Sequence, residues 1–177
     1  MTTTLIRPAT PTGRERFLGE DELIVSKTDV EGRITYANKT FQKIAGYSED
    51  ELLGAPHNIV RHPDMPRCVF RLLWDTIGSG REIFAYVLNM AKTGDHYWVF
   101  AHVTPSFDAS GRIVGYHSNR RAPERSAVKK AHELYQVILA EERKHQSPQR
   151  QVEAGLALVT KVLTDAKISY DEFVFSL

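Results

Sequence analysis

Pro56-His-Asn-Ile-Val-Arg-His-Pro-Asp-Met-Pro66 is the stretch that decides the fold, and it places two histidines, an arginine and an aspartate between three prolines. Each proline fixes its own φ angle, removes a backbone donor and disfavours helical backbone in the preceding residue. We therefore expect a shaped loop that holds its polar side chains in place. Two interpretations stay open: Arg61 and His62 contact an anion or a cofactor, or Asp64 caps a helix that begins at Met65.

The segment after this loop predicts one helix and three strands. Apolar residues recur at helical spacing from Met65 to Ile77, and two glycines follow at positions 78 and 80. Three extended runs then cover residues 82–90, 96–105 and 112–121, with Gly-containing turns between them. These runs are expected to form an antiparallel meander.

The segment before the loop predicts a β-hairpin and two short helices. Residues 22–28 and 33–36 have the alternation of short strands. Asn38 occupies the position of a helix N-cap, and Ser48 with Glu51 spells a capping box for the next helix. Together with the meander, this order predicts an α+β domain over residues 22–121, with a five-stranded antiparallel sheet and short helices on one face.

The alternation of side chains along the strands predicts two different faces. If Asn89 points toward the helices, Val87 and Ala85 do so too, and these small side chains leave room for a cavity. The opposite face then carries large apolar side chains, which must be covered by a partner or by another part of the chain. These side chains are Phe84, Tyr86, Leu88, Trp98 and Phe100.

The two ends of the chain are expected to behave differently. Residues 1–13 are rich in Thr and Pro and predict a flexible leader, within an N-terminal region of residues 1–21. Residues 122–177 predict a helical extension, in which two amphipathic helices form a hairpin and a capping box at Ser169 starts a last helical turn. We expect the helices or the N-terminal segment to cover the apolar face, within one chain or across a homodimer.

Composition restricts the kinds of partner. The 177 residues carry a formal net charge of +1, which gives no reason to expect binding to nucleic acid or to an anionic membrane. No apolar run is long enough to cross a bilayer, so no direct membrane insertion is expected. The single cysteine, Cys68, fits a reducing compartment, and we expect a cytoplasmic protein. No motif joins a nucleophile, a base and an orienting group, and no metal-ligand spacing is present, so we expect neither an enzyme nor a metal site.

Five motifs follow one another along the chain: Gly32-Arg-Ile-Thr-Tyr-Ala-Asn38, Gly46-Tyr-Ser, Glu51-Leu-Leu-Gly54, the proline-bounded loop, and Gly94-Asp-His-Tyr-Trp98. With them, residues 22–121 resemble a PAS domain of the bacterial aerotaxis-receptor type. The resemblance implies an FAD-binding redox sensor of the energy-taxis kind that relays its signal to a chemoreceptor or another signalling protein. It implies flavin-site roles for Arg61, His62, Asp64 and Asn89, with Asn38 near the pocket. Ile83 stands where flavin-binding members carry a tryptophan.

The chemistry of the residues leaves alternatives to FAD open. An inward Asn89 amide suits the rim of donors and acceptors around an isoalloxazine ring, and the Arg61 guanidinium suits a pyrophosphate. PAS domains also hold haem, for which His57 and His62 are the candidate axial ligands. A purely structural role of the loop, in which Arg61 and Asp64 pair to hold its shape, also stays open. The remaining possibility for the whole protein is a cofactor-free interaction or dimerisation module.

Overall fold

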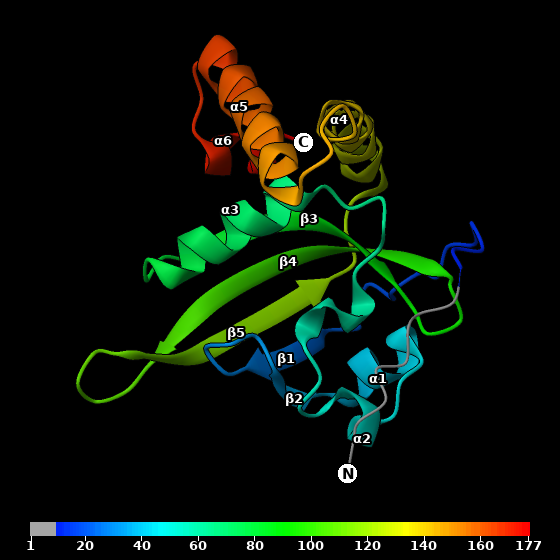
Figure 1. The fold of residues 1–177 in the computed structure, drawn as a ribbon. Coiled ribbons are helices and arrows are strands. Elements are labelled where there is room, and N and C mark those ends of the chain that lie inside the picture. Colours follow the sequence, from blue (N-terminus) through cyan, green and yellow to red (C-terminus); the bar gives the residue numbers. More distant parts are fainter. Residues whose placement is uncertain (1–9) are drawn as a thin grey trace.

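A five-stranded antiparallel sheet forms the centre of the computed structural model, which describes residues 10–177 (Figure 1). Its strands lie in the order β2-β1-β5-β4-β3, so β1 joins the N-terminal hairpin to the C-terminal meander by pairing with β5. The strands are β1 (Ile24–Thr28), β2 (Ile34–Ala37), β3 (Ile83–Met90), β4 (His96–Phe107) and β5 (Ile113–Arg121). The predicted α+β fold with five antiparallel strands is confirmed.

Four helical segments connect β2 to β3, and their ends follow the predicted capping. They are α1 (Lys39–Ala45), α2 (Glu49–Leu52), the 3₁₀ turn η1 (His57–Val60) and α3 (Arg67–Gly78). Asn38 caps α1, and Ser48 forms the capping box of α2 with Glu51. The start of α3 differs from the prediction, because the helix begins at Arg67 and Asp64 does not cap it.

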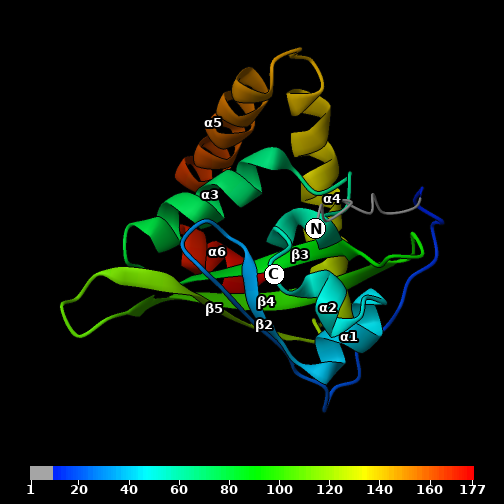
Figure 2. The ribbon, with the colours of Figure 1, turned by 60° about the horizontal axis from the view of Figure 1, so that its bottom comes forward.

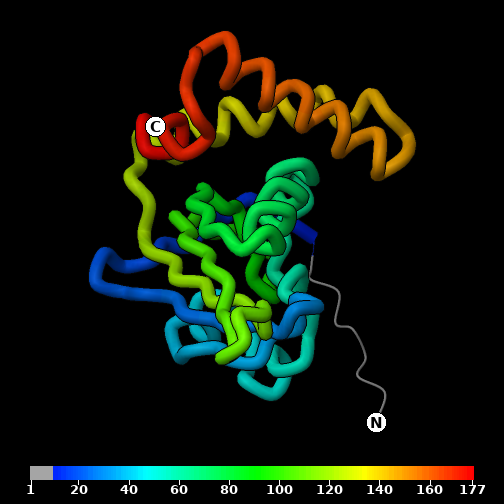
Figure 3. Tube along the Cα trace, turned by 90° about the vertical axis from the view of Figure 1, so that its left-hand side faces the viewer, coloured from blue at the N-terminus to red at the C-terminus, as the bar shows by residue number. Residues whose placement is uncertain are grey.

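Three C-terminal helices complete the chain. They are α4 (Arg125–Glu142), α5 (Pro148–Ala166) and α6 (Tyr170–Ser176), and they lie on the side of the sheet opposite α1 and α2 (Figures 1 and 3). The rings of Trp98 and Tyr135 stack at 5.9 Å, and those of Phe84 and Phe175 lie 4.8 Å apart. The apolar outer face is therefore covered by helices of the same chain, one of the arrangements expected from the sequence.

The same helices protect the free edge of β3. The Tyr135 hydroxyl donates a hydrogen bond to the Tyr86 carbonyl at 2.6 Å, and the Tyr170 hydroxyl donates to the Phe84 carbonyl at 3.0 Å. An edge strand presents unpaired backbone groups, which invite pairing with another chain. The two tyrosines from α4 and α6 therefore satisfy carbonyls that would otherwise remain available.

Helix α3 lies between this edge and α5, as both views show (Figures 1 and 2). Gly155 of α5 allows the close approach, because a Cβ atom there would lie 2.7 Å from the Cys68 sulfur. At the N-terminus of α3, the backbone amides of Arg67 and Cys68 donate to the buried carboxylate of Glu142, at 3.0 and 2.8 Å. Glu142 therefore caps α3, which is the role that the sequence had suggested for Asp64.

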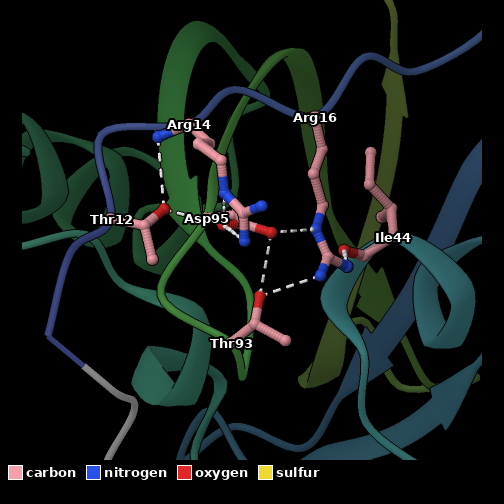
Figure 4. Close-up of polar contacts among 6 residues, drawn as sticks. All are labelled: Thr12, Arg14, Arg16, Ile44, Thr93 and Asp95. Carbon is pink, nitrogen blue, oxygen red and sulfur yellow. Dashed lines mark hydrogen bonds and ion pairs between the residues drawn. The ribbon is translucent and has the colours of Figure 1, made fainter.

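The segment before β1 is fastened to the turn between β3 and β4. The Asp95 carboxylate accepts hydrogen bonds from Thr12, Arg14 and Arg16 (Figure 4). The Thr12 amide also donates to the Gly94 carbonyl. These bonds, first among them the one from Thr12, hold the pKa of Asp95 well below its usual range. The prediction of a flexible leader is therefore wrong for residues 10–13, while residues 1–9 lie outside the described part of the chain.

None of the helices in the described residues is long and apolar enough to cross a membrane.

Candidate functional site

A cavity of about 360 Å³ lies between the inner face of the sheet, α3 and the proline-bounded loop. One face of α3 gives it an apolar wall, and strands β3 and β4 contribute Val87, Ala101 and Val103. The α3 residues on this wall are Phe70, Leu73, Trp74 and Ile77. The cavity follows from the small inward side chains of β3 and β4, as the strand pattern predicted.

Asn89 lies on the wall of this cavity and is only 3% exposed. Its position confirms the predicted inward face of β3, because Val87 lines the same cavity while Phe84 and Trp98 contact the C-terminal helices. The Asn89 backbone also forms an antiparallel bridge with Arg61 of the loop. The loop thus continues the edge of β3 and ends close to the Asn89 amide.

Arg61 lines two hollows at once, the cavity and a wider groove of about 670 Å³ between the loop and the start of the α4–α5 connection. Its guanidinium lies 4.7 Å from the centre of the Phe70 ring and donates to the Met65 carbonyl at 3.2 Å. Burial lowers the pKa of Arg61 from its ordinary value, although the group stays cationic in the neutral range. A charge at this junction can reach a ligand that extends from the cavity into the groove.

His57 also faces the cavity, where its Nε2 lies 3.3 Å from the Ser26 hydroxyl and its ring stacks on Phe41. Desolvation, with a smaller contribution from the Arg120 charge, lowers the pKa of His57 to about 3. The imidazole is therefore neutral at neutral pH. It can accept or donate a hydrogen bond but adds no charge to the cavity.

The other proposed site residues lie elsewhere. His62 is 5% exposed and lines the groove rather than the cavity, and its Nδ1 accepts from the Asp64 amide at 3.0 Å. Asp64 pairs with Arg143 of the C-terminal extension at 2.9 Å, so the suggested staple between Arg61 and Asp64 is wrong. Asn38 lines neither hollow, because its side chain is used in capping α1 and in bonds to Val25 and Leu23.

Arg120 is the site residue that the sequence did not single out. It lies on β5, is 2% exposed and lines the cavity. Pairing of β5 with β4 places it beside the small Ala101. The alternation along residues 112–121 would have identified it, had that strand been assigned faces as the preceding two were.

The described residues contain no group of three or more His, Cys, Asp or Glu side chains that could hold a metal ion. The polar side chains that line the cavity are instead amides, guanidinium groups, imidazoles and hydroxyls, with the exposed Glu31 carboxylate at its mouth. This donor set suits a planar organic ligand with carbonyl and ring-nitrogen groups on its rim.

Comparison with known proteins shows which family this fold belongs to. Residues 34–120 match the family described as PAS fold. The chain is 41% identical over 123 residues to the aerotaxis receptor of Escherichia coli, covering 70% of this chain and 24% of that protein. It is 29% identical over 97 residues to a nitrogen fixation regulatory protein of Klebsiella pneumoniae, covering 55% of this chain and 20% of that protein. The chain thus spans a quarter or less of the length of these two relatives.

The fold is also found in a solved photoreceptor domain. The dark structure of the blue-light photoreceptor Aureochrome1 LOV superposes with a TM-score of 0.56 and 24% identity, covering 64% of this chain and 85% of that chain. At this identity the likeness concerns the fold alone. The matched family, the sheet order and the placement of the cavity lead to one conclusion: residues 34–120 form a PAS domain.

Proposed function

We propose that this protein is a sensory PAS protein that binds FAD in the inner cavity and relays the redox state of the flavin by contact with another protein. The observation that carries the proposal is the buried Asn89 amide on the cavity wall, beside an arginine that joins the cavity to an outer groove. The resemblance to FAD-binding aerotaxis-receptor PAS domains and the 41% identity to an aerotaxis receptor support it.

The residues present fit a flavin. The cavity volume of 360 Å³ is near the lower end of the range of about 300–1,000 Å³ for ligand pockets, which suits a flat ring system rather than a whole dinucleotide. Asn89 would hold the ring by hydrogen bonds to its rim, and Arg61 would hold the pyrophosphate where the cavity meets the groove. Two donor atoms of the buried Arg120, Nε and Nη1, lack a partner within residues 10–177 and would find acceptors on such a ligand.

Bound FAD would supply reversible electron uptake, and the protein would contribute binding, orientation and exclusion of water. Arg61 and Asn89 orient the ligand, and the apolar wall of α3 shields it. The other side of α3 contacts α5 and carries the amides that bind Glu142. A movement of α3 would therefore be transmitted to α5 and α4 through these contacts.

Haem is less well supported than flavin. His57 is the candidate axial ligand that faces the cavity, whereas His62 lines the outer groove. Amide and guanidinium groups on the walls match the polar rim of a flavin better than the apolar body of a porphyrin. In a cofactor-free interaction module, the Nε and Nη1 donors of Arg120 would stay buried without a ligand to accept their hydrogen bonds.

The output in this proposal is a protein contact and not a catalysed reaction. A chemoreceptor or another cytoplasmic signalling protein would contact the C-terminal helices, where Val137 and Phe175 remain exposed. A homodimer is part of the proposal, although the stripe of Val128, Tyr135 and Ile138 is already buried within one chain. Light scattering on the full chain distinguishes a dimer from a monomer.

The Asn89→Ala variant tests the proposed ligand contact. We expect the wild-type protein, mixed with FAD and passed through a gel-filtration column, to keep one flavin per chain by visible absorbance. Asn89→Ala should lose the flavin and keep its circular dichroism spectrum, because an inward amide stabilises the ligand more than the fold. Asn119→Ala on β5 is the matched control and should bind FAD like the wild type. Wild-type occupancy in Asn89→Ala would contradict the assigned contact, and a wild-type protein that takes up no FAD would refute the proposed function.

A further inference from the structure

Arg120 carries a buried charge on the cavity wall that no acidic group of the described chain neutralises. No ion pair within residues 10–177 includes it, and its Nε and Nη1 atoms have no hydrogen-bond partner there. Its Nη2 atom donates to the Ser26 hydroxyl, and its guanidinium lies 4.4 Å from the centre of the Phe41 ring. The Arg120 guanidinium thus contacts a neutral hydroxyl and an aromatic face, and neither of these groups carries a negative charge.

Burial without a counter-ion is costly for a guanidinium. Desolvation lowers the pKa of Arg120 to about 10, which still leaves the group protonated at neutral pH. The titratable groups beside it are neutral: His57 has a lowered pKa, and burial raises the pKa of the Tyr97 phenol well above its usual range. Glu31 at the mouth of the cavity is exposed and pairs with Arg33. The cavity therefore holds a fixed positive charge.

The neighbours of Arg120 leave space for a ligand rather than for a protein partner. On the adjacent strand the paired residue is Ala101, whose side chain is small, and the apolar residues of α3 form the facing wall. A positive charge buried on a cavity wall stabilises negative charge more strongly than it would in water, because the effective dielectric constant is lower. The ligand that benefits most from this site is one that carries a negative charge in the cavity.

We propose that Arg120 makes this cavity bind reduced flavin more tightly than oxidised flavin. The inference rests on the proposed function. In an anaerobic titration, dithionite would give two electrons to the isoalloxazine ring and would itself be oxidised to sulfite. The ring takes up one proton from water and keeps one negative charge. The Arg120 charge stabilises that anion, and linkage requires that a site which favours the reduced form also raises the midpoint potential of the bound flavin.

Arg120→Met removes the charge and keeps an unbranched apolar side chain, and Arg121→Met is the matched control. Arg121 is the next residue of β5, points to the outer face and lies over Phe100 at 5.2 Å. The midpoint potential of bound FAD is measured by anaerobic dithionite titration with a reference dye, and the affinity for oxidised FAD by fluorescence. We expect Arg120→Met to lower the potential, with a loss of about tenfold or more in the preference for reduced flavin. Arg121→Met should match the wild type, and Arg120→Lys should recover most of the potential.

The ligand-free protein gives a second readout. Without flavin, Arg120→Met should melt at a higher temperature than the wild type, because it removes an uncompensated buried charge, and Arg121→Met should not. An unchanged potential in Arg120→Met, which would mean equal losses of affinity for oxidised and reduced FAD, would overturn the inference, and so would a lower melting temperature of its ligand-free form. A wild-type protein that binds no FAD would instead refute the proposed function.

Discussion

His57 shows how burial in the cavity changes the behaviour of a single residue. Its pKa of about 3 in the folded protein is below the value of about 6.5 in an unfolded chain. The unfolded state therefore binds more protons between these two pH values, and stability decreases as the pH falls through this window. We expect the unfolding free energy of the ligand-free protein to fall by up to about 1.4 kcal/mol per pH unit below pH 6.5 from this residue alone.

Urea unfolding at a series of pH values measures this effect. His57→Gln should lose much of the slope between pH 4 and pH 6, because glutamine does not titrate. His132→Gln replaces an exposed histidine of α4 and is the control, which should keep the wild-type slope. Equal slopes in the wild type and in His57→Gln would show that His57 becomes protonated without cost and is not desolvated.

At the level of residues, the sequence predicted those parts of the site that depend on local pattern. The alternation of side chains along β3 predicted that Asn89 points into the cavity, and the three prolines predicted that Arg61 lies in a shaped loop. The partner of Asp64 could not be predicted, since Arg143 is 79 residues away and belongs to another element. The role of Glu142 was hidden for the same reason, because a carboxylate from α4 caps α3 only after the helices have packed.

At the level of elements, Glu142 connects the C-terminal extension to the start of α3. Glu142→Ala removes the acceptor of two backbone amides, which we expect to cost about 1–3 kcal/mol of unfolding free energy. Hydrogen exchange should become faster at the Arg67 and Cys68 amides. Glu141→Ala, which removes the partially exposed neighbouring carboxylate, should change stability by less than about 0.5 kcal/mol. Equal losses in the two variants would argue against a specific cap at α3.

The elements themselves were predicted well wherever short-range signals mark their ends. Capping residues fixed the starts of α1, α2, α5 and α6. The N-terminal segment was not predicted, because its Thr and Pro content resembles that of a flexible leader. It is held by long-range bonds to Asp95, and no local pattern reports such bonds (Figure 4).

At the level of the whole molecule, the C-terminal helices and the sheet protect each other. A chain that ends at Arg121 would expose large apolar side chains, each of which gains about 1.5–3 kcal/mol from burial. It would also free the Phe84 and Tyr86 carbonyls at the edge of β3. We expect this truncated chain to self-associate or precipitate, as measured by light scattering at increasing concentration. A soluble monomeric truncation would show that the helices are not needed to cover this face.

The central claim is that the inner cavity is the flavin site, and a cavity-filling variant tests it most directly. Ala101 lies on the cavity wall between β3 and β5, so Ala101→Leu places a larger side chain where the ring would bind. Ala109→Leu, in the exposed turn between β4 and β5, is the control. The measurement is the amount of FAD per folded chain after reconstitution, by visible absorbance and circular dichroism. Our account predicts one flavin per chain for the wild type and Ala109→Leu, and almost none for a folded Ala101→Leu; full occupancy in a folded Ala101→Leu would contradict it.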